Sequence, residues 1–327
     1  MKTELSYQVN DIDAYKSKLM NWASKFDSCC ILQSNRTGQD INSKNPSEKS
    51  YDLLVASGGL RCFEGNDSDS FESLKSFCSS ANSWVFGFFT YDLKNELEDL
   101  KSENYDGVGM PSCHFFNPEY LFMINGNEVT LQLAEGDSEG AKKLKGEIER
   151  IDNTPEEINE IQSISQRITK EAYLKSVKEI KEHISYGNIY ELNFCQEFYA
   201  EDFKINPFQL FEKLNSISET PFACFYRLDE KYLICGSPER FIRKKGSQII
   251  SQPIKGTIKR GNTEAEDLAL AQNLAQSEKD KNENDDYSFW YRDLSVLKES
   301  DQLQKYTNKV VKLGQPAILK IELKKSS

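Results

Sequence analysis

The sequence places a carboxylic acid and an amine beside two consecutive turns, where both could take part in one reaction. Glu239 lies in the sequence SPER at 237–240, and Lys255 lies in the sequence PIKGT at 253–257. Proline and glycine shape the backbone on either side of Lys255, which suits a lysine held in place. A desolvated lysine can lose its proton and become a nucleophile, and a nearby carboxylic acid can transfer protons. The alternative is a surface hairpin with ordinary solvated charges.

Two short strands would bring these groups together. Residues 241–243 and 247–254 are expected to form strands, joined by a turn at 244–246. The glycine in this turn and the apolar pattern of the second strand favour a hairpin. Because a hairpin folds its two ends back to one side, we expect it to bring Glu239 beside Lys255.

Four motifs stand in an order that resembles a known family. In chain order they are GNIYELNF at 187–194, SPERF at 237–241 followed by PIKGT, RGNT at 260–263 followed by Asp267, and SEKDKNEN at 277–284. Together they resemble the chorismate-utilising enzymes, which include anthranilate synthase, aminodeoxychorismate synthase component I, isochorismate synthase and salicylate synthase. Several ordered motifs make a more specific match than any one of them alone.

The resemblance implies an α+β fold with two packed antiparallel β-sheets flanked by helices, incomplete at the C-terminus. It also implies a division of the 327 residues. Residues 1–135 would form the N-terminal portion of the fold, and 136–168 a charged linker. Residues 169–284 would form the chorismate-binding catalytic portion, and 285–327 a divergent tail.

The resemblance further implies a reaction. The lysine of PIKGT is typical of the aminodeoxychorismate synthase branch, which converts chorismate and ammonia to 4-amino-4-deoxychorismate for para-aminobenzoate and folate biosynthesis. Lys255 would attack the ring to form a covalent adduct, and Glu239 would act as acid and base. A glutamine amidotransferase subunit would supply the ammonia. Two alternatives stay open: an anthranilate synthase component I, and an inactive remnant that only binds a partner.

Four more residues take roles from the resemblance. Gly256 and Thr257 would contact the substrate, and so would Glu191. Glu191 stands where the water-adding members carry a lysine, so isochorismate is not the expected product. Glu283 would be a ligand of Mg²⁺, which prefers carboxylate oxygen. The alternative for Glu283 is an ordinary carboxylate on a solvated helix.

The resemblance stops after Glu283 and Asn284. The family continues there with an apolar strand, whereas this chain reads DDYSFWYR at 285–292. The family's later motifs, including its second metal-binding glutamate, have no counterpart. The sequence therefore predicts a chain that is truncated or frame-disrupted relative to the family.

Periodicity predicts the remaining elements. Strands are expected at 29–34, 52–57, 84–91, 115–124, 128–133, 189–198, 222–228 and 231–235. Helices are expected at 11–25, at 68–79, from a Thr169 cap to Gly187, and after Asn206-Pro207 with Phe208, Phe211, Leu214 and Ile217 on the buried side. The strand at 84–91 is apolar on both sides, which favours a central position in its sheet.

Bulk composition narrows the functional classes. The net charge of −11 argues against nucleic-acid binding, which needs a basic surface. No apolar run is long enough to cross a membrane, and the N-terminus does not resemble a signal peptide, so we expect a cytoplasmic protein. The eight cysteines lack C-x-x-C spacing, which predicts reduced thiols. With only two histidines, a zinc site or histidine triad is not expected.

Overall fold

The computed structural model describes residues 3–35, 51–65, 69–81, 83–152, 163–190, 192–201, 204–245, 248–252, 258–259, 261–276, 292–293 and 321–323. Its contacts divide the chain into two units. The first contains Met1–Glu182, Phe194–Ser237 and Ile318–Ser327, and the second contains His183–Asn193 and Pro238–Ala317. The division into four segments at 1–135, 136–168, 169–284 and 285–327 stays a prediction.

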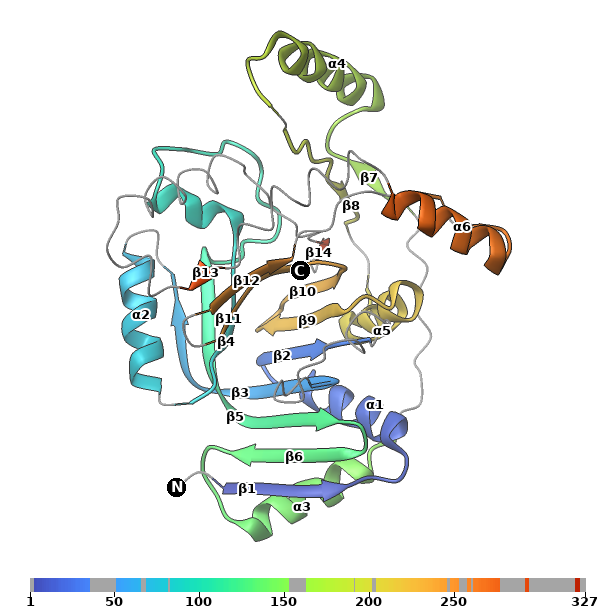
Figure 1. The fold of residues 1–327 in the computed structure, drawn as a ribbon. Helices are drawn as coiled ribbons and strands as arrows, with labels where there is room; N and C mark the ends of the chain where they lie inside the picture. The colour runs from blue at the N-terminus through green and yellow to red at the C-terminus, as the bar shows by residue number, and fades with distance from the viewer. Residues whose placement is uncertain are drawn as a thin grey trace. The chain divides into compact units, whose positions relative to one another are not determined.

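A nine-stranded antiparallel sheet forms the centre of the first unit. Its strands are β1 (Thr3–Gln8), β2 (Ser28–Gln33), β3 (Leu53–Glu64), β4 (Phe86–Phe89), β5 (Cys113–Asn125), β6 (Glu128–Leu133), β9 (Phe222–Leu228), β10 (Lys231–Ser237) and β14 (Ile321–Leu323). The order across the sheet is β1-β6-β5-β3-β2-β9-β10-β14, and β4 pairs with β5 (Figure 1). Strands far apart in sequence are therefore neighbours: β2 pairs with both β3 and β9.

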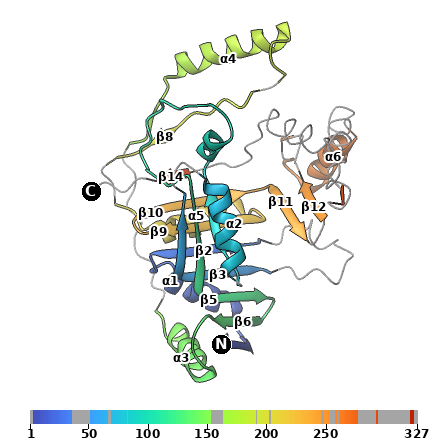
Figure 2. The same ribbon diagram turned by 90° about the vertical axis from the view of Figure 1, so that its left-hand side faces the viewer.

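Three helices cover one face of this sheet, because each presents an apolar stripe to it. They are α1 (Ile12–Ala23), α3 (Ser138–Glu149) and α5 (Pro207–Ser218), and Figure 2 shows α3 beside the β1–β6 end of the sheet. Leu19 of α1, Ile148 of α3 and Phe211 of α5 are almost fully buried in one core cluster with residues of the sheet.

A second cluster packs on strands of the same sheet and contains a buried polar pair. Phe116 and Tyr226 belong to this cluster. His114 lies beside them, 2% exposed, with its Nδ1 atom 2.6 Å from the Tyr226 hydroxyl. Burial lowers the pKa of His114 and raises the pKa of Tyr226. The helix α2 (Ser70–Ala81) buries Leu74.

A small two-stranded sheet lies elsewhere in the first unit. It pairs β7 (Ser165–Gln166) with β8 (Phe198–Tyr199). Between these strands the chain forms α4 (Lys170–Tyr186). Thr169 caps the start of α4 by accepting a hydrogen bond from the Ala172 amide at 3.2 Å. Gly187 follows its end with φ of 87°, a left-handed conformation that favours glycine. A short 3-10 helix, η2 (Tyr91–Glu96), also belongs to this unit.

The described residues of the second unit include a three-stranded antiparallel sheet, the last residues of α4 and the helix α6. The sheet has the order β11-β12-β13, with β11 at Arg240–Lys245, β12 at Gln248–Gln252 and β13 at Arg292–Asp293. The helix α6 spans Glu264–Ala275.

The predicted α+β class with antiparallel sheets is confirmed, and three local predictions are wrong. Residues 192–197 form no strand, and of the predicted segment only Phe198 lies in a described strand, β8. The strand predicted at 84–91 shortens to Phe86–Phe89, and among the described strands it pairs with β5 alone, so it is not central. Ile217, expected on the buried side of α5, is 73% exposed in the last turn of that helix.

Two findings bear on the class of protein. Within the described ranges, no helix is long and apolar enough to cross a membrane. All eight cysteines are free thiols; Cys29, Cys30, Cys113 and Cys235 are buried. Burial raises the pKa of the Cys235 thiol to about 11.

Candidate functional site

The hairpin of β11 and β12 forms as predicted and carries one described candidate residue. Glu239 is half-buried and lies directly before Arg240, the first residue of β11. Glu239 takes part in interactions within the structure, so it is not a free surface carboxylate. Its place immediately before a paired strand restricts the backbone that carries it.

The register of the hairpin decides what lies near the start of β11. Arg240 is the cross-strand partner of Gln252, and Lys245 is the partner of Gln248. The register shifts between Arg240 and Arg243, so a bulge or irregularity lies there. Arg240 begins β11 and Gln252 ends β12, and the two residues are cross-strand partners. Glu239 therefore lies at the end of the hairpin where β12 finishes.

Five of the six candidate residues lie outside the described residues. They are Glu191, Lys255, Gly256, Thr257 and Glu283. Lys255 follows Gln252 by three positions in the sequence, so a chain of this length reaches at most about 10 Å from the end of β12. The predicted partnership of Glu239 and Lys255 is compatible with this reach and stays a prediction.

The chain that returns from the lysine segment is held against the start of α6. The Gly261 amide donates to Asp267 Oδ1 at 2.8 Å, and the Asn262 amide donates to Glu266 Oε2 at 2.8 Å. Thr263 caps the helix by accepting a hydrogen bond from the Glu266 amide at 3.2 Å. These contacts are a variant of the capping box, with Glu266 reaching one residue further back.

Gly261 has no room for a side chain. An added Cβ atom would lie 2.3 Å from the backbone nitrogen of Asp267 and 2.7 Å from its Cα atom. Real Cβ atoms essentially never come this close to backbone. The motif RGNT followed by Asp267 therefore encodes a close approach of the chain to the first turn of α6. The resemblance gave no role to Gly261 or Asp267, although the T-x-x-E spacing could have indicated the cap.

The GNIYELNF motif lies in a sequence segment whose two flanking residues, Arg167 and Glu197, are joined within the first unit. Arg167 forms a bidentate ion pair with Glu197, with nitrogen–oxygen distances of 2.8 and 3.0 Å. The Arg167 guanidinium also lies 4.0 Å from the ring centre of Tyr199 and 5.1 Å from that of Tyr105. The hydrogen bond from Arg167 lowers the pKa of Glu197. These contacts close the base of the excursion that contains α4.

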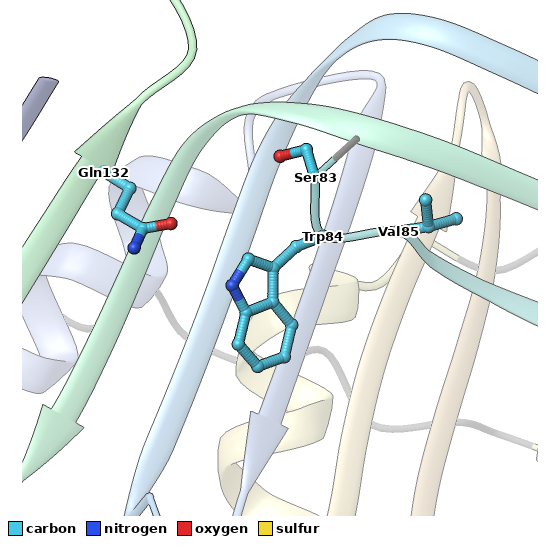
Figure 3. Close-up of a pocket in the computed structure, with 4 residues that line it drawn as sticks. All are labelled: Ser83, Trp84, Val85 and Gln132. Carbon is cyan, nitrogen blue, oxygen red and sulfur yellow. The ribbon is translucent and has the colours of Figure 1, made fainter. Parts of the chain in front are cut away.

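A hollow in the first unit has no chemically active lining. Ser83, Trp84, Val85 and Gln132 line it, and Figure 3 shows the Trp84 indole and the Gln132 amide facing this space. The Gln132 amide already donates to Glu4 at 2.8 Å. The lining contains no titratable side chain and none of the candidate residues.

The described residues offer no complete metal site. Nowhere among them do three or more His, Cys, Asp or Glu side chains come together in a way that could hold a metal ion. Glu283 lies outside this part of the chain, so the expected Mg²⁺ site stays a prediction.

Comparison with known proteins defines the class to which this fold belongs. The structure of anthranilate synthase component I from Streptococcus pneumoniae aligns with a TM-score of 0.58 and 19% sequence identity, over 76% of this chain and 62% of that one. The similarity shows a shared fold. The family model described as chorismate binding enzyme matches residues 27–285. The chain therefore belongs to the chorismate binding enzyme family.

The relatives are named for two different synthase activities. Aminodeoxychorismate synthase component 1 of Bacillus subtilis is 26% identical over 217 residues, which is 61% of this chain and 45% of the relative. Anthranilate synthase component 1 of Thermus thermophilus is 30% identical over 206 residues, which is 60% of this chain and 44% of the relative. The chain thus spans less than half the length of each relative in these alignments.

Proposed function

We propose that this chain acts on chorismate as component I of an aminodeoxychorismate synthase, in the route to para-aminobenzoate and folate. The family supports chorismate as the substrate class. The relatives carry both an aminodeoxychorismate and an anthranilate synthase name, so the choice between them rests on Lys255 in PIKGT. The observation that supports the proposal is the pairing of Arg240, which follows Glu239, with Gln252, the last residue of β12.

The proposed reaction exchanges a ring hydroxyl for an amino group in two displacements. The neutral amine of Lys255 attacks C2 of the ring, the ring double bonds shift, and the C–O bond at C4 breaks. Glu239 protonates the departing hydroxyl, which leaves as water, because hydroxide is a poor leaving group. The result is a covalent lysine adduct.

The second displacement reverses the electron shift. Ammonia attacks C4 and loses a proton to the Glu239 carboxylate, which restores the acid. The bond between C2 and the Lys255 nitrogen breaks, and the product is 4-amino-4-deoxychorismate. Lys255 must be neutral to attack, so the pocket in this proposal favours an uncharged amine beside a protonated Glu239.

The other four candidate residues would bind the substrate or the metal ion. Gly256, Thr257 and Glu191 would bind chorismate, and Glu283 would hold Mg²⁺ near its carboxylates. No step above is routed through the metal ion. A glutamine amidotransferase subunit would release the ammonia.

Two alternative functions make different predictions. An anthranilate synthase component I would release anthranilate and would not need Lys255. A non-catalytic chain would bind a partner and leave chorismate unchanged.

The deciding experiment identifies the products and tests whether their formation requires Lys255. The purified chain is incubated with chorismate, ammonium and Mg²⁺, and products are resolved by liquid chromatography and mass spectrometry. We expect 4-amino-4-deoxychorismate from the wild type and from Lys259→Ala, since Lys259 is an exposed lysine outside the hairpin. We expect none from Lys255→Ala. Anthranilate fluorescence, or product from Lys255→Ala, would favour the anthranilate synthase; no turnover at all would favour the non-catalytic chain.

A further inference from the structure

Three cysteines lie side by side on one face of the nine-stranded sheet, on the neighbouring strands β2, β9 and β10. Cys224 of β9 is directly opposite Cys235 of β10 in the strand register. Cys30 of β2 is directly opposite Tyr226 of β9, so it lies diagonally from Cys224. Opposite residues of antiparallel strands share a face of the sheet, and so do residues two positions apart on one strand. The three thiols therefore share one face, with Cys224 in the middle.

The three thiols differ in their access to solvent. Cys30 belongs to the second core cluster, and Cys224 packs against that cluster. Cys30 and Cys235 are 3% and 6% exposed, whereas Cys224 is half-buried. Of the three, Cys224 is thus the one that a small oxidant can reach from solvent.

Neighbouring thiols can bind a metal ion or form a disulfide. Among the residues that the structure describes, no three His, Cys, Asp or Glu side chains are placed to hold a metal ion. The Cα atoms of opposite residues in antiparallel strands lie about 4.5–5.5 Å apart. This spacing falls within the roughly 4.4–6.8 Å that a disulfide spans. Diagonal neighbours lie about 7–8 Å apart, so the backbone favours a bond from Cys224 to Cys235 over one from Cys224 to Cys30.

Cys30 provides a hydrogen bond to the middle thiol. The hydrogen bond with Cys224, together with burial, raises the pKa of Cys30. Cys30 therefore keeps its proton at neutral pH, and its S–H group can donate to the Cys224 sulfur. A donated hydrogen bond stabilises a thiolate, which is the form of cysteine that attacks an oxidant.

We propose that Cys224 and Cys235 are a peroxide-sensitive pair, in which Cys224 is oxidised first and Cys235 then completes a disulfide between β9 and β10. The Cys224 thiolate attacks one oxygen of hydrogen peroxide, so an S–O bond forms and the O–O bond breaks. The other oxygen leaves as hydroxide and takes up a proton to become water.

The second step joins the strands. The Cys235 sulfur attacks the sulfenic sulfur of Cys224, the S–S bond forms and the S–O bond breaks. The hydroxyl group leaves with the Cys235 thiol proton as a second water. Two thiols are oxidised and one peroxide is reduced to two waters. This proposal is independent of the reaction proposed for chorismate.

Peptide mapping of the wild-type full chain tests the proposal. The folded chain is treated with hydrogen peroxide, remaining thiols are blocked with N-ethylmaleimide, and unreduced tryptic peptides are analysed by mass spectrometry. Trypsin cleaves after Arg227 and Lys231, so Cys224 and Cys235 lie on the separate peptides 214–227 and 232–240. We expect these two peptides to be joined by a bond that dithiothreitol removes.

Matched variants separate the roles of the three thiols. Cys235→Ser should abolish the joined peptides and leave a sulfenic acid on Cys224, which dimedone traps. Cys224→Ser should leave the buried Cys235 unoxidised. Cys30→Ala removes the hydrogen-bond donor and should slow the linkage by roughly 2- to 10-fold, whereas Cys30→Ser keeps a donor and should restore the rate. An unchanged rate in Cys30→Ala would overturn the role of Cys30.

The wild type alone can overturn the proposal, so the test does not depend on whether each variant folds. The exposed thiols Cys62, Cys78 and Cys195 are the internal reference. Oxidation confined to these three would overturn the proposal, and so would a disulfide that joins Cys30 to Cys224. A link that forms only after unfolding in urea would also overturn it, because the strand register would then have no part in the reaction.

Discussion

Gln252 lies directly opposite Arg240 in the β11–β12 ladder, and this pair aligns the two chain segments that carry the proposed chemistry. Glu239 precedes one member of the pair, and the segment containing Lys255 follows the other. The carboxylic acid can serve both displacements only if the amine meets it at one end of the hairpin. The strand register is therefore the structural reason to test Glu239 and Lys255 together.

Glu239 should be required for amination. Glu239→Gln keeps the size of the side chain but cannot deliver a proton to the departing hydroxyl, so we expect kcat to fall by about 10²- to 10⁴-fold. KM for chorismate should change much less. Steady-state kinetics with ammonium checks this, and Glu201→Gln, at an exposed position, is the control. A Glu239→Gln variant with wild-type kcat would remove Glu239 from the mechanism.

The His114–Tyr226 pair should stabilise the first unit. Tyr226→Phe leaves buried His114 Nδ1 without this hydrogen bond, and we expect the free energy of unfolding to fall by about 1–3 kcal/mol. Urea unfolding at pH 7.5 measures the change. An unchanged midpoint would show that the hydrogen bond makes no net contribution.

The same pair gives stability a pH dependence. Burial lowers the pKa of His114 in the folded state, so the unfolded state takes up a proton first as pH falls. Stability should be constant above the unfolded pKa of about 6.5 and should decline below it, until the folded pKa is passed. Unfolding measured between about pH 5 and about pH 8 (about 1.5 units each side of that pKa) checks this slope. His114→Gln should reduce it, whereas His183→Gln, at an exposed position on α4, should not.

Arg167 should hold the base of the α4 excursion closed. Arg167→Lys keeps the charge but loses the bidentate contact to Glu197 and the planar stacking on Tyr199, so limited proteolysis between 167 and 197 should become several-fold faster. Arg150→Ala, at an exposed position after α3, is the control.

Lowering the pH should also weaken the Arg167–Glu197 contact and speed proteolysis of the α4 excursion. Arg167 lowers the pKa of Glu197, so the stabilisation is complete above the unfolded pKa of Glu197 and is lost as pH falls through the folded pKa. The wild type should therefore be cleaved faster as pH falls through that range, and Arg167→Ala should show little pH dependence. Parallel pH profiles for the two proteins would contradict this account.

Two leucines on different helices should differ sharply in their effect on stability. Leu144 of α3 is 9% exposed in the core, and Leu144→Ala should cost about 2–5 kcal/mol. Leu174 of α4 is 56% exposed, and Leu174→Ala should cost less than about 0.5 kcal/mol. Thermal unfolding of the two variants measures both. Equal losses would show that α4 is buried in solution.

Local sequence patterns predicted much of the first unit. Thr169 and Gly187 marked the ends of α4, and the Asn125–Glu128 pair closes the predicted hairpin of β5 and β6. These features depend on neighbours in sequence, which a pattern can reveal. The position of β4 could not be predicted, because its apolar residues report burial and not the number of neighbouring strands. The same limit applies to residues 192–197, whose strand-like composition does not lead to a strand.

The candidate site was predictable only in part. The hairpin follows from residue types and spacing and is confirmed, whereas the roles of Glu239 and Lys255 come from the resemblance and stay predictions. The contact of Asp267 with Gly261 does not follow from spacing, because it depends on how closely the chain approaches α6. Motif resemblance identified these residues as a group without indicating their physical roles.

The pairing of β2 with β9 has a consequence for biosynthesis. β2 ends at Gln33, and its partner β9 begins at Phe222. A ribosome adding about 5–20 residues per second needs on the order of ten seconds or more to reach that partner. During this time β2 presents an open hydrogen-bonding edge that includes the apolar residues Ile31 and Leu32. The nascent chain therefore depends on delayed pairing or chaperone binding to avoid aggregation, and slower translation before residue 222 should lower its soluble yield.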